Sequence, residues 1–475
     1  MPKNQSRPMG GFFLYGRRSS VADQMTKAAT AIFQQSPLFL RPGRPSGRMI
    51  WTTMASSWTF LPFTRRVQLI RGLVLPVRGS AEGYSNEILG FLGTSWAAGF
   101  VIGCFVAPAI VRRAGHVRAF GSFVALICLT VLMTGLIVDD VWWIALRALT
   151  GFCTAGTSMI IESWLNERAT NESRGMIFSL YIAITLLGVV AGQMIVPMGD
   201  ISNTSLFMIC GIIYCIAILP ATLSKAASPQ PLQKVSLDLP ALYRNSPVSF
   251  IGILMIGIAN GAYGTLGAVF GARAGLDPTM IAIMVSVTIF FGALAQFPAG
   301  RLSDRIDRRY VLAGLAGLGA VAGLAVAVVQ PRDVYVLISM VAIYGAAANA
   351  LYPIAVAHAN DYAAAEDFVK VSGGLLLLYG IGTIIGPTLG GAVMTYSGPY
   401  ALFFVTAVAH VLITAYAIIR SRQRAALSTG EKDNFSTMMP TTPSPLVTPE
   451  SIALDPRAPQ YPEDDGDYVE KGAGI

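Results

Sequence analysis

The sequence predicts an all-α membrane protein with twelve transmembrane helices, arranged as two six-helix pseudo-repeats whose first helix is atypical. Three observations carry this prediction: the composition, a series of apolar runs of bilayer length, and the uneven charge of the loops between them. The 475 residues are 53% hydrophobic and 13% charged, with a mean hydropathy of +0.57. A soluble globular chain usually holds about 25% charged residues. This composition therefore indicates a polytopic membrane protein.

Apolar runs of roughly 20 residues, enough to cross about 30 Å of hydrocarbon, recur along most of the chain. In the first part of the chain they cover 88–111, 119–138, 141–163, 175–197 and 203–223. After a polar link they cover 248–271, 279–300, 310–330, 333–357, 371–396 and 400–419. Together with one damaged helix before them, these runs divide into six and six.

The beginning of the chain is harder to assign. Residues 1–48 are polar and basic and lack the clean apolar core of a signal peptide. The segment MIWTTMASSWTFLPF that follows is apolar enough to enter a membrane, but Arg65, Arg66 and Arg71 interrupt the run after it. Either this first helix is short and tolerated by its neighbours, or the coding sequence upstream of about Gly72 is shifted or wrongly started. We favour the second explanation.

Loop charge predicts the orientation of the helices. One alternating set of loops is rich in basic residues, namely Arg112, Arg113, Arg118, Arg168, Arg174, Lys225, Lys234, Arg244, Arg301, Arg305, Arg308, Arg309, Lys370, Arg420, Arg422 and Arg424. The other set holds Arg78, Arg273 and Arg332. Cytoplasmic loops carry an excess of Lys and Arg. We therefore predict a multi-pass protein of the cell inner membrane with both termini in the cytoplasm.

The predicted organisation follows from these spans and from the polar segments around them. The acidic C-terminal tail lacks apolar periodicity and is expected to be disordered. The predicted parts are a polar basic N-terminal segment (1–48), an N-terminal six-helix half (49–223), a cytoplasmic linker (224–247), a C-terminal six-helix half (248–419) and the disordered cytoplasmic tail (420–475).

The sequence also argues against several function classes. The five cysteines lie within or beside apolar runs without metal-ligand spacing, so we interpret them as packing residues. We find no phosphate-binding loop, zinc signature or nucleophile–base set, and we therefore predict neither an enzyme nor a cofactor. The net charge of +8 does not indicate a nucleic-acid partner, because the basic residues lie in loops where membrane topology explains them.

Polar residues inside the third clean span form the first candidate site. An arginine in a membrane span costs roughly 2.5–3.5 kcal/mol on insertion scales and should face a polar interior. At helical spacing, Arg147, Gly151, Thr154, Ser158 and Glu162 share one narrow face. We interpret this face as the lining of a solute path. The alternative is a buried pair that ties two helices together.

Two features recur at nearly the same offset and indicate duplicated halves. The basic loops RRAGHVR and RLSDRIDRR align with Arg113 on Arg305, an offset of 192 residues. Two Gly-x3-Gly pairs beginning at Gly188 and Gly382 lie at an offset of 194 residues. Duplicated halves are a common plan of secondary transporters.

The loop sequence GRLSDRIDRR resembles the cytoplasmic loop motif of the major facilitator superfamily. It departs at Asp307, where that motif usually has glycine, and the first-half loop has Arg112 where the motif has aspartate. We expect the charged pairs of this loop to govern the inward–outward equilibrium more than they touch solute. The residues assigned to this conformational gating are Gly300, Asp304, Arg305, Arg308 and Arg309.

Arg147 with Gly151 resembles the span-4 motif of the same superfamily, which is associated with proton or substrate coupling. The resemblance extends from about Gly72 to Arg420 and implies a secondary transporter that works by alternating access through rocking of its two halves.

A narrower resemblance is to the YcaD-like subgroup, through the segments IESWLNERATNESRG (161–175), YPIAVAHANDY (352–362) and YGIGTIIGPTLGG (379–391). Some alphaproteobacterial transporters with these features are riboflavin importers, so the resemblance implies riboflavin transport, with riboflavin as the small organic solute. The glycine–proline pattern of superfamily antiporters occurs here in span 11 and is incomplete in span 5, which favours import. Multidrug or metabolite efflux, and a non-transporting membrane sensor, remain the alternatives.

In this superfamily, spans 1, 4, 7 and 10 line the central cavity, which implies a set of solute-binding residues. A planar heteroaromatic solute would suit tyrosine faces and a few amide groups. The candidates are Arg147, Asn260, Tyr263, Tyr344, Asn349, Tyr352 and Tyr379. The alternative is that the tyrosines are interfacial or packing residues.

Coupling to protons would need a group that changes its charge. Glu162 is the best membrane carboxylate, and His358 could titrate near neutral pH. Glu162 could instead cap a helix or pair with Arg168 or Arg174. Proton coupling and facilitated diffusion therefore both stay open.

Overall fold

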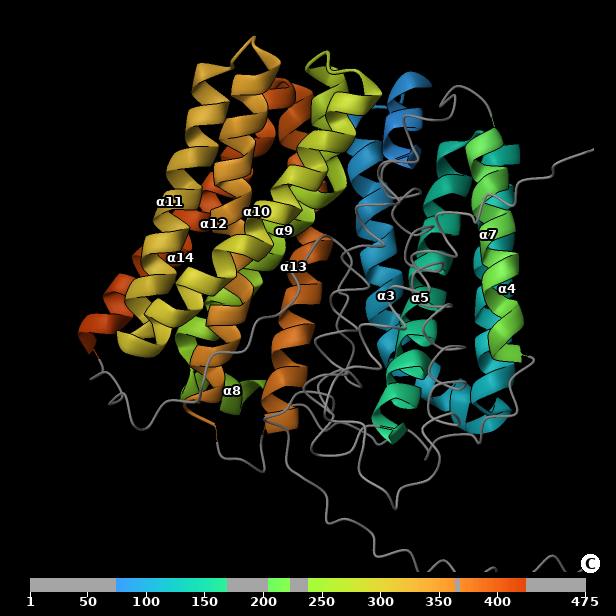
Figure 1. Ribbon diagram of the computed structural model, residues 1–475, viewed down its shortest axis with the longest axis horizontal. Coiled ribbons are helices and arrows are strands. Elements are labelled where there is room, and N and C mark those ends of the chain that lie inside the picture. The colour runs from blue at the N-terminus through green and yellow to red at the C-terminus, as the bar shows by residue number, and fades with distance from the viewer. Residues whose placement is uncertain (1–73, 169–203, 223–237, 364–367, 424–475) are drawn as a thin grey trace, which may run out of the picture. The chain divides into compact units, whose positions relative to one another are not determined.

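The computed structural model describes residues 74–168, 204–222, 238–363 and 368–423, and every regular element among them is a helix (Figure 1). The predicted N-terminal segment, the damaged first helix before residue 74, the span 175–197 and the tail from 424 onward lie outside the described residues. Residues 74–81 are helical and bury Val74, Leu75 and Val77.

The helices of the first half follow the predicted spans closely. They are α3 (Asn86–Ala114), α4 (His116–Leu136), α5 (Asp140–Arg168) and α7 (Ser205–Thr222). Those of the second half are α8 (Leu239–Asn245), α9 (Pro247–Arg273), α10 (Pro278–Arg305), α11 (Arg308–Val329), α12 (Val334–Asn360), α13 (Phe368–Ser397), the 3₁₀ helix η4 (Pro399–Ala401) and α14 (Leu402–Gln423). The short helix α8 lies in the predicted linker, where no helix was expected.

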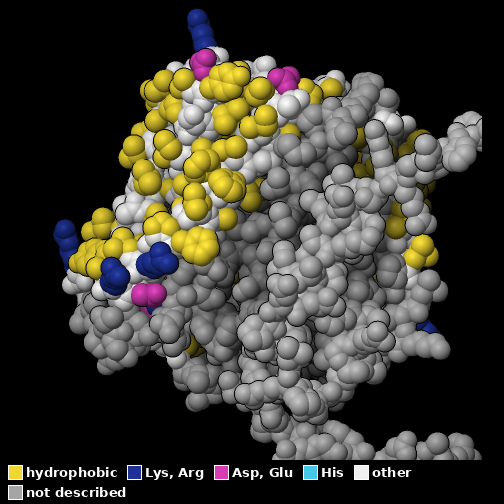
Figure 2. All heavy atoms as spheres, in the orientation of Figure 1, with side chains coloured by type: hydrophobic (Ala, Val, Ile, Leu, Met, Phe, Trp, Pro, Cys, Tyr) yellow, Lys and Arg dark blue, Asp and Glu magenta, His cyan; other side chains and the backbone are white. Residues whose placement is uncertain are grey.

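Nine of the described helices are long and apolar enough to cross a membrane, and α7 contributes a shorter apolar stretch, Ser205–Ile216. Their outer surfaces carry large apolar side chains that face away from the helix contacts, including Phe105, Phe290, Val321 and Val328. On the face drawn in Figure 2, hydrophobic side chains cover much of the described surface, with few charges between them. The prediction of an all-helical, multi-span membrane protein is confirmed.

Aspartates set the beginning of several helices in the second half. Asp277 accepts hydrogen bonds from the backbone N–H groups of the first turn of α10. Asp333 does the same for α12, and Asp307 accepts one from the backbone N–H of Arg309 in α11. The first N–H groups of a helix have no hydrogen-bond acceptor within the helix, and a carboxylate at the N-cap supplies an acceptor.

Helix packing forms two groups with a contact between them. In the first group α5 packs against α3 and α4, and α4 packs against α7. In the second group α9 packs against α13 and α14, α10 against α12, and α11 against α12 and α14. The two groups meet where α3 packs against α13 and, to a smaller extent, against α9.

Candidate functional site

The polar face of α5 is turned inward, as the sequence predicts. Thr154 and Glu162 are fully buried, and Ser158 is nearly so. Gly151 lies against α3, where an added Cβ would overlap the backbone carbonyl of Trp96. A line of polar groups is thus held inside the helix packing and away from lipid.

Arg147 begins this line on the side of α5 that meets α3. Its Nε donates to the backbone carbonyl of Leu92 in α3 at 3.3 Å, and the side chain is partly buried. A carbonyl stabilises the guanidinium without neutralising it. The polar face therefore carries a positive group at one end and the buried Glu162 carboxyl four helical turns further along.

Two of the predicted solute-binding tyrosines point into the second helix group. The Tyr263 hydroxyl of α9 is 2.9 Å from the Thr288 hydroxyl of α10. Its ring lies 5.3 Å from that of Tyr344 in α12, and Tyr344 packs edge-on against Phe403 and His410 of α14. These contacts join four helices, which agrees with the alternative that tyrosines serve packing. Solute binding by Tyr263 and Tyr344 stays a prediction.

Asn349 of α12 lies beside this aromatic cluster and contacts α10. Its Nδ2 donates to the backbone carbonyl of Thr288 at 3.3 Å and to that of Gly345 in its own helix at 3.1 Å. Its own backbone carbonyl accepts from Nε2 of Gln296 at 3.4 Å. The amide that was expected to meet solute is engaged here in holding α12 to α10.

The remaining predicted binding and coupling residues are buried in the second helix group. Tyr352 of α12 and Tyr379 of α13 stack edge-on with ring centres 5.1 Å apart, inside the apolar core of this group. Asn260 of α9 is 6% exposed. His358 is 5% exposed, and its ring lies 5.1 Å from that of Tyr362 at the end of α12. The structure therefore groups Tyr352 with Tyr379 and leaves His358 far along α12 from Tyr344.

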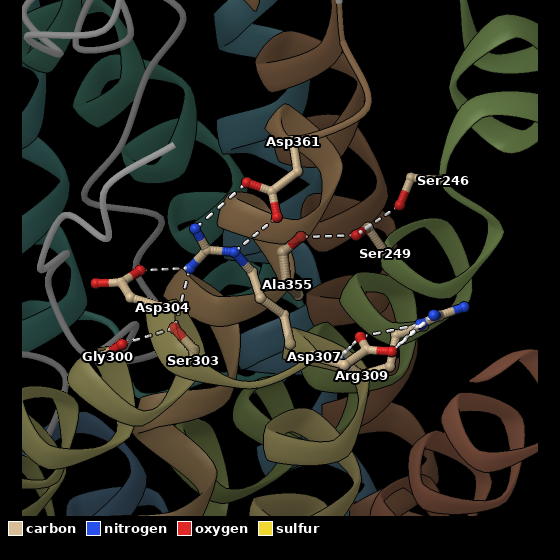
Figure 3. Close-up of polar contacts among 10 residues, drawn as sticks. Ser246, Ser249, Gly300, Ser303, Asp304, Asp307, Arg309, Ala355 and Asp361 are labelled. Atoms are coloured by element: carbon tan, nitrogen blue, oxygen red, sulfur yellow. Dashed lines mark hydrogen bonds and ion pairs between the residues drawn. The ribbon is translucent and has the colours of Figure 1, made fainter. Parts of the chain in front are cut away.

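Three of the predicted gating residues, Asp304, Arg308 and Arg309, take part in an ion-pair cluster at the turn between α10 and α11 (Figure 3). Arg308 is 1% exposed and donates from Nε and Nη2 to the two carboxylate oxygens of Asp361, at 2.7 and 3.3 Å. Its Nη1 donates to the Ser303 hydroxyl at 2.9 Å and to Asp304 at 3.1 Å. Gly300 accepts from the Ser303 hydroxyl, and Arg305 is exposed. One guanidinium thus joins the ends of α10, α11 and α12.

Asp307, the departure from the loop motif, has a structural role at the start of α11. Its carboxylate pairs with Arg309 at 2.6 Å, and Arg309 also donates to the backbone carbonyl of Arg420 in α14 at 3.1 Å. Burial alone would raise the pKa of Asp307, but the hydrogen bonds and charge of Arg309 outweigh it and hold this pKa below its usual range. An aspartate here therefore caps α11 and binds Arg309, the residue that contacts α14, and a glycine would supply neither carboxylate contact.

Asp361 and Ser303 are site residues that sequence reasoning missed. Asp361 lies 53 positions after Arg308, and its side chain is 2% exposed. It stands at the end of the stretch YPIAVAHANDY, where a lone carboxylate directly after an apolar span was the available signal. Its partner could not be read from spacing, because the contact joins two helix ends that are distant in the chain.

The comparisons with known proteins agree with the helical fold. The model of the Major Facilitator Superfamily matches residues 50–277 and 246–458 of the chain. A protein described as an uncharacterized MFS-type transporter from Yersinia pestis (strain Pestoides F) is 26% identical over 359 residues, covering 74% of this chain and 92% of that protein. The uncharacterized MFS-type transporter YcaD from Shigella flexneri serotype 5b (strain 8401) is 25% identical over 352 residues, covering 73% and 90%.

Two solved structures have a similar fold. The nucleoside transporter NupG superposes with a TM-score of 0.64 at 13% identity, covering 77% of this chain and 98% of that one. A bacterial homologue of the human lysosomal transporter Spinster, in an inward-facing and occupied conformation, gives a TM-score of 0.65 at 14% identity, covering 83% and 100%. At these identities the likeness concerns the fold alone.

Proposed function

The chain belongs to the major facilitator superfamily, and we propose that within this family it takes up a small organic solute, riboflavin being the leading candidate. It is a multi-pass membrane protein and a secondary transporter. The proposal has four parts: inward transport, riboflavin as the solute, location in the inner membrane, and both termini in the cytoplasm.

The observation that carries the proposal is the buried polar line on α5. Thr154, Ser158 and Glu162 are enclosed by neighbouring helices in a span that is otherwise apolar. Ionisable and polar groups inside a membrane span are expensive, and in transporters they mark substrate or ion pathways. Arg147 at the other end of the line supplies a fixed positive charge beside α3.

Import is supported by the place of the glycine–proline pattern in α13. The glycines Gly382 and Gly386 lie against the backbone carbonyls of Leu254 and Ile258 in α9. In α13 the pattern therefore serves packing, because its glycines allow close contact with α9 within one helix group. Riboflavin itself rests on the resemblance of three sequence segments to the YcaD-like subgroup, because some transporters with these features import riboflavin.

The ion-pair cluster at the turn between α10 and α11 fits a role in the inward–outward equilibrium. Arg308 links the ends of three helices, and Asp304 is its most exposed partner, with a side chain 36% exposed. Loss of this partner would change how firmly the helix ends are held without removing a group near the polar line of α5. This supports conformational gating as the role of the cluster.

Growth of a riboflavin auxotroph on low micromolar riboflavin, with and without expression of this chain, tests the proposal. Rescue establishes both the solute and inward transport. If growth fails although the protein is present in the membrane, an apolar first helix is restored ahead of Gly72 and the experiment repeated. A second failure removes riboflavin from the proposal. Increased drug sensitivity of a deletion strain would then favour efflux.

A further inference from the structure

We infer that Cys128 of α4 and Cys215 of α7 form an oxidation site, where a lipid hydroperoxide converts their two thiols into a disulfide bond inside the membrane. The sequence pattern indicates packing cysteines, because nothing in the spacing relates these two residues. The structure brings them together: their Sγ atoms lie 3.5 Å apart, although 87 positions separate them in the chain. The inference concerns neither the solute nor the direction of transport.

Hydrogen bonds hold the two sulfurs against each other. The Cys128 Sγ donates to the backbone carbonyl oxygen of Gly211 in α7, at 3.5 Å. A thiol has one hydrogen to donate, and its sulfur can accept another. Because the Cys128 hydrogen is engaged with the Gly211 carbonyl, the Cys215 thiol is the donor to the Cys128 sulfur. The two groups therefore contact each other directly, without an intervening side chain.

Glycines on both helices bring α4 and α7 close together around this pair (Figure 1). A Cβ at Gly211 of α7 would overlap the Leu132 side chain of α4, and a Cβ at Gly135 of α4 would lie 3.0 Å from the Cβ of Phe207 in α7. Small residues let helix backbones approach closely. The sulfurs need to approach by about 1.5 Å to reach the bond length of a disulfide, which small rotations about the two Cα–Cβ bonds supply.

The two thiols differ in their access to lipid. Cys215 is exposed, whereas Cys128 is 9% exposed and covered by protein. On the same helix as Cys215, the apolar side chains of Ile212, Ile216 and Leu219 are also exposed. Apolar side chains on the outside of a membrane helix meet acyl chains, which are as apolar as leucine. The oxidant that reaches Cys215 therefore comes from the lipid phase, where peroxidised acyl chains carry hydroperoxide groups.

The oxidation proceeds in two balanced steps. The Cys215 sulfur attacks the terminal hydroperoxide oxygen, and as the O–O bond breaks the thiol proton passes to the departing oxygen, which leaves as an alcohol. Cys215 is then a sulfenic acid, the first oxidised state of a cysteine. The Cys128 sulfur attacks the Cys215 sulfur, and the sulfenic hydroxyl leaves as water with the Cys128 proton. Two thiols lose two electrons in total, and one hydroperoxide is reduced.

A count of free thiols in the full chain tests the site. The purified protein in proteoliposomes is treated with cumene hydroperoxide, an organic hydroperoxide that dissolves in the bilayer. It is then denatured and labelled with a polyethylene glycol maleimide, which adds mass at each free thiol. The untreated chain should carry five labels, one for each cysteine, and the treated chain should carry three, because the disulfide consumes two thiols. Dithiothreitol should restore all five labels.

Serine variants assign the two steps to the two cysteines. Cys128→Ser should accumulate a sulfenic acid on Cys215 that dimedone traps, because the second thiol is missing. Cys215→Ser should give no dimedone adduct on Cys128, because Cys128 is covered by protein. Cys104→Ser is the matched control, since Cys104 lies on α3, outside the contact between α4 and α7. Its labels should fall by two, as in the parent.

The inference is overturned if the treated parent keeps all its labels, or if dithiothreitol does not restore the labels that are lost. It is also overturned if Cys128→Ser or Cys215→Ser still loses two labels reversibly. The first two results come from the parent chain, so they do not depend on the folding of a variant. The experiment contains no solute, so its outcome is separate from that of riboflavin rescue.

Discussion

Arg308 shows, at the scale of one residue, how this protein buries a charge at the end of its helices. The guanidinium has a carboxylate on two sides and a hydroxyl beside it. A buried ion pair is stable only when its remaining hydrogen-bonding groups are also satisfied. Asp361 and Ser303 meet that requirement for Arg308.

Removing one member of the buried pair should destabilise the protein strongly. Asp361→Asn leaves a buried guanidinium without its main countercharge, for which we expect a loss of about 3–5 kcal/mol. Asp304→Asn is the control, because a partly exposed pair contributes about 1 kcal/mol or less. Thermal unfolding of the purified protein in detergent measures both. Equal losses in the two variants would contradict the dominant role of Asp361.

Asp307 should make stability depend on pH in one direction. Its pKa is lowered in the folded protein, so its contribution is fully present above the pKa of the unfolded chain, about 3.9, and is lost as the pH falls through the lowered value. The difference in melting temperature between the parent and Asp307→Asn should therefore be constant near neutral pH and shrink below about pH 4. A difference that stays constant on acidification would argue against the ionised pair.

Glu162 tests whether transport is coupled to protons. With an inward proton gradient imposed on proteoliposomes, the parent should accumulate solute, and Glu162→Gln should exchange solute without accumulating it. The reason is that the buried carboxyl is the group of the polar line that can take up and release a proton. Unchanged accumulation in Glu162→Gln would remove this residue from the coupling mechanism.

At the scale of one element, α12 is interrupted by Pro353 and repaired by its neighbour. Proline has no N–H, so the backbone carbonyl of Asn349, four residues earlier, lacks its partner within the helix. Gln296 of α10 donates to this carbonyl. A polar side chain in the membrane interior is thereby explained by a proline in another helix.

A double-mutant cycle can isolate this repair. Gln296→Leu should destabilise the protein by about 1–3 kcal/mol, because a buried carbonyl loses its donor. In a Pro353→Ala background the restored N–H can bond the carbonyl, and the same substitution should have a smaller effect. Unfolding of the four proteins gives the coupling directly. Additive effects would show that Gln296 acts on some other group.

The spans could be predicted from sequence because apolar length is a direct physical signal. The prediction 88–111 corresponds to α3 (Asn86–Ala114), and 400–419 to α14 (Leu402–Gln423). The helix ends were less accessible, since α10 and α12 continue past the predicted ends at 300 and 357 to Arg305 and Asn360. The short helix α8 was missed for another reason: its length is below that of any hydropathy window.

The candidate site could be predicted only in part. The inward face of α5 follows from helical periodicity, because exposing a line of polar groups to lipid would be costly. The contacts of Tyr263, Tyr344 and Asn349 depend on which neighbouring helix each one meets, and periodicity does not supply that. The pairing of Arg308 with Asp361 likewise depends on how the ends of α11 and α12 are brought together.

At the scale of the whole molecule, the proposed transport function gives separate roles to the polar line on α5 and to the ion-pair cluster of Arg308. We propose that the polar line offers a solute or an ion a path through the apolar interior. We also propose that the cluster holds the helix ends of the second group together while the two helix groups move as units.

Counterflow of labelled riboflavin in proteoliposomes is the most direct test that this chain carries the solute. Vesicles containing the purified full chain and unlabelled riboflavin should take up labelled riboflavin in a saturable way, and excess outside riboflavin should abolish the uptake. Vesicles without protein give the background, and a structurally unrelated nutrient serves as the competitor control. Uptake at the background rate by correctly folded protein would contradict riboflavin transport.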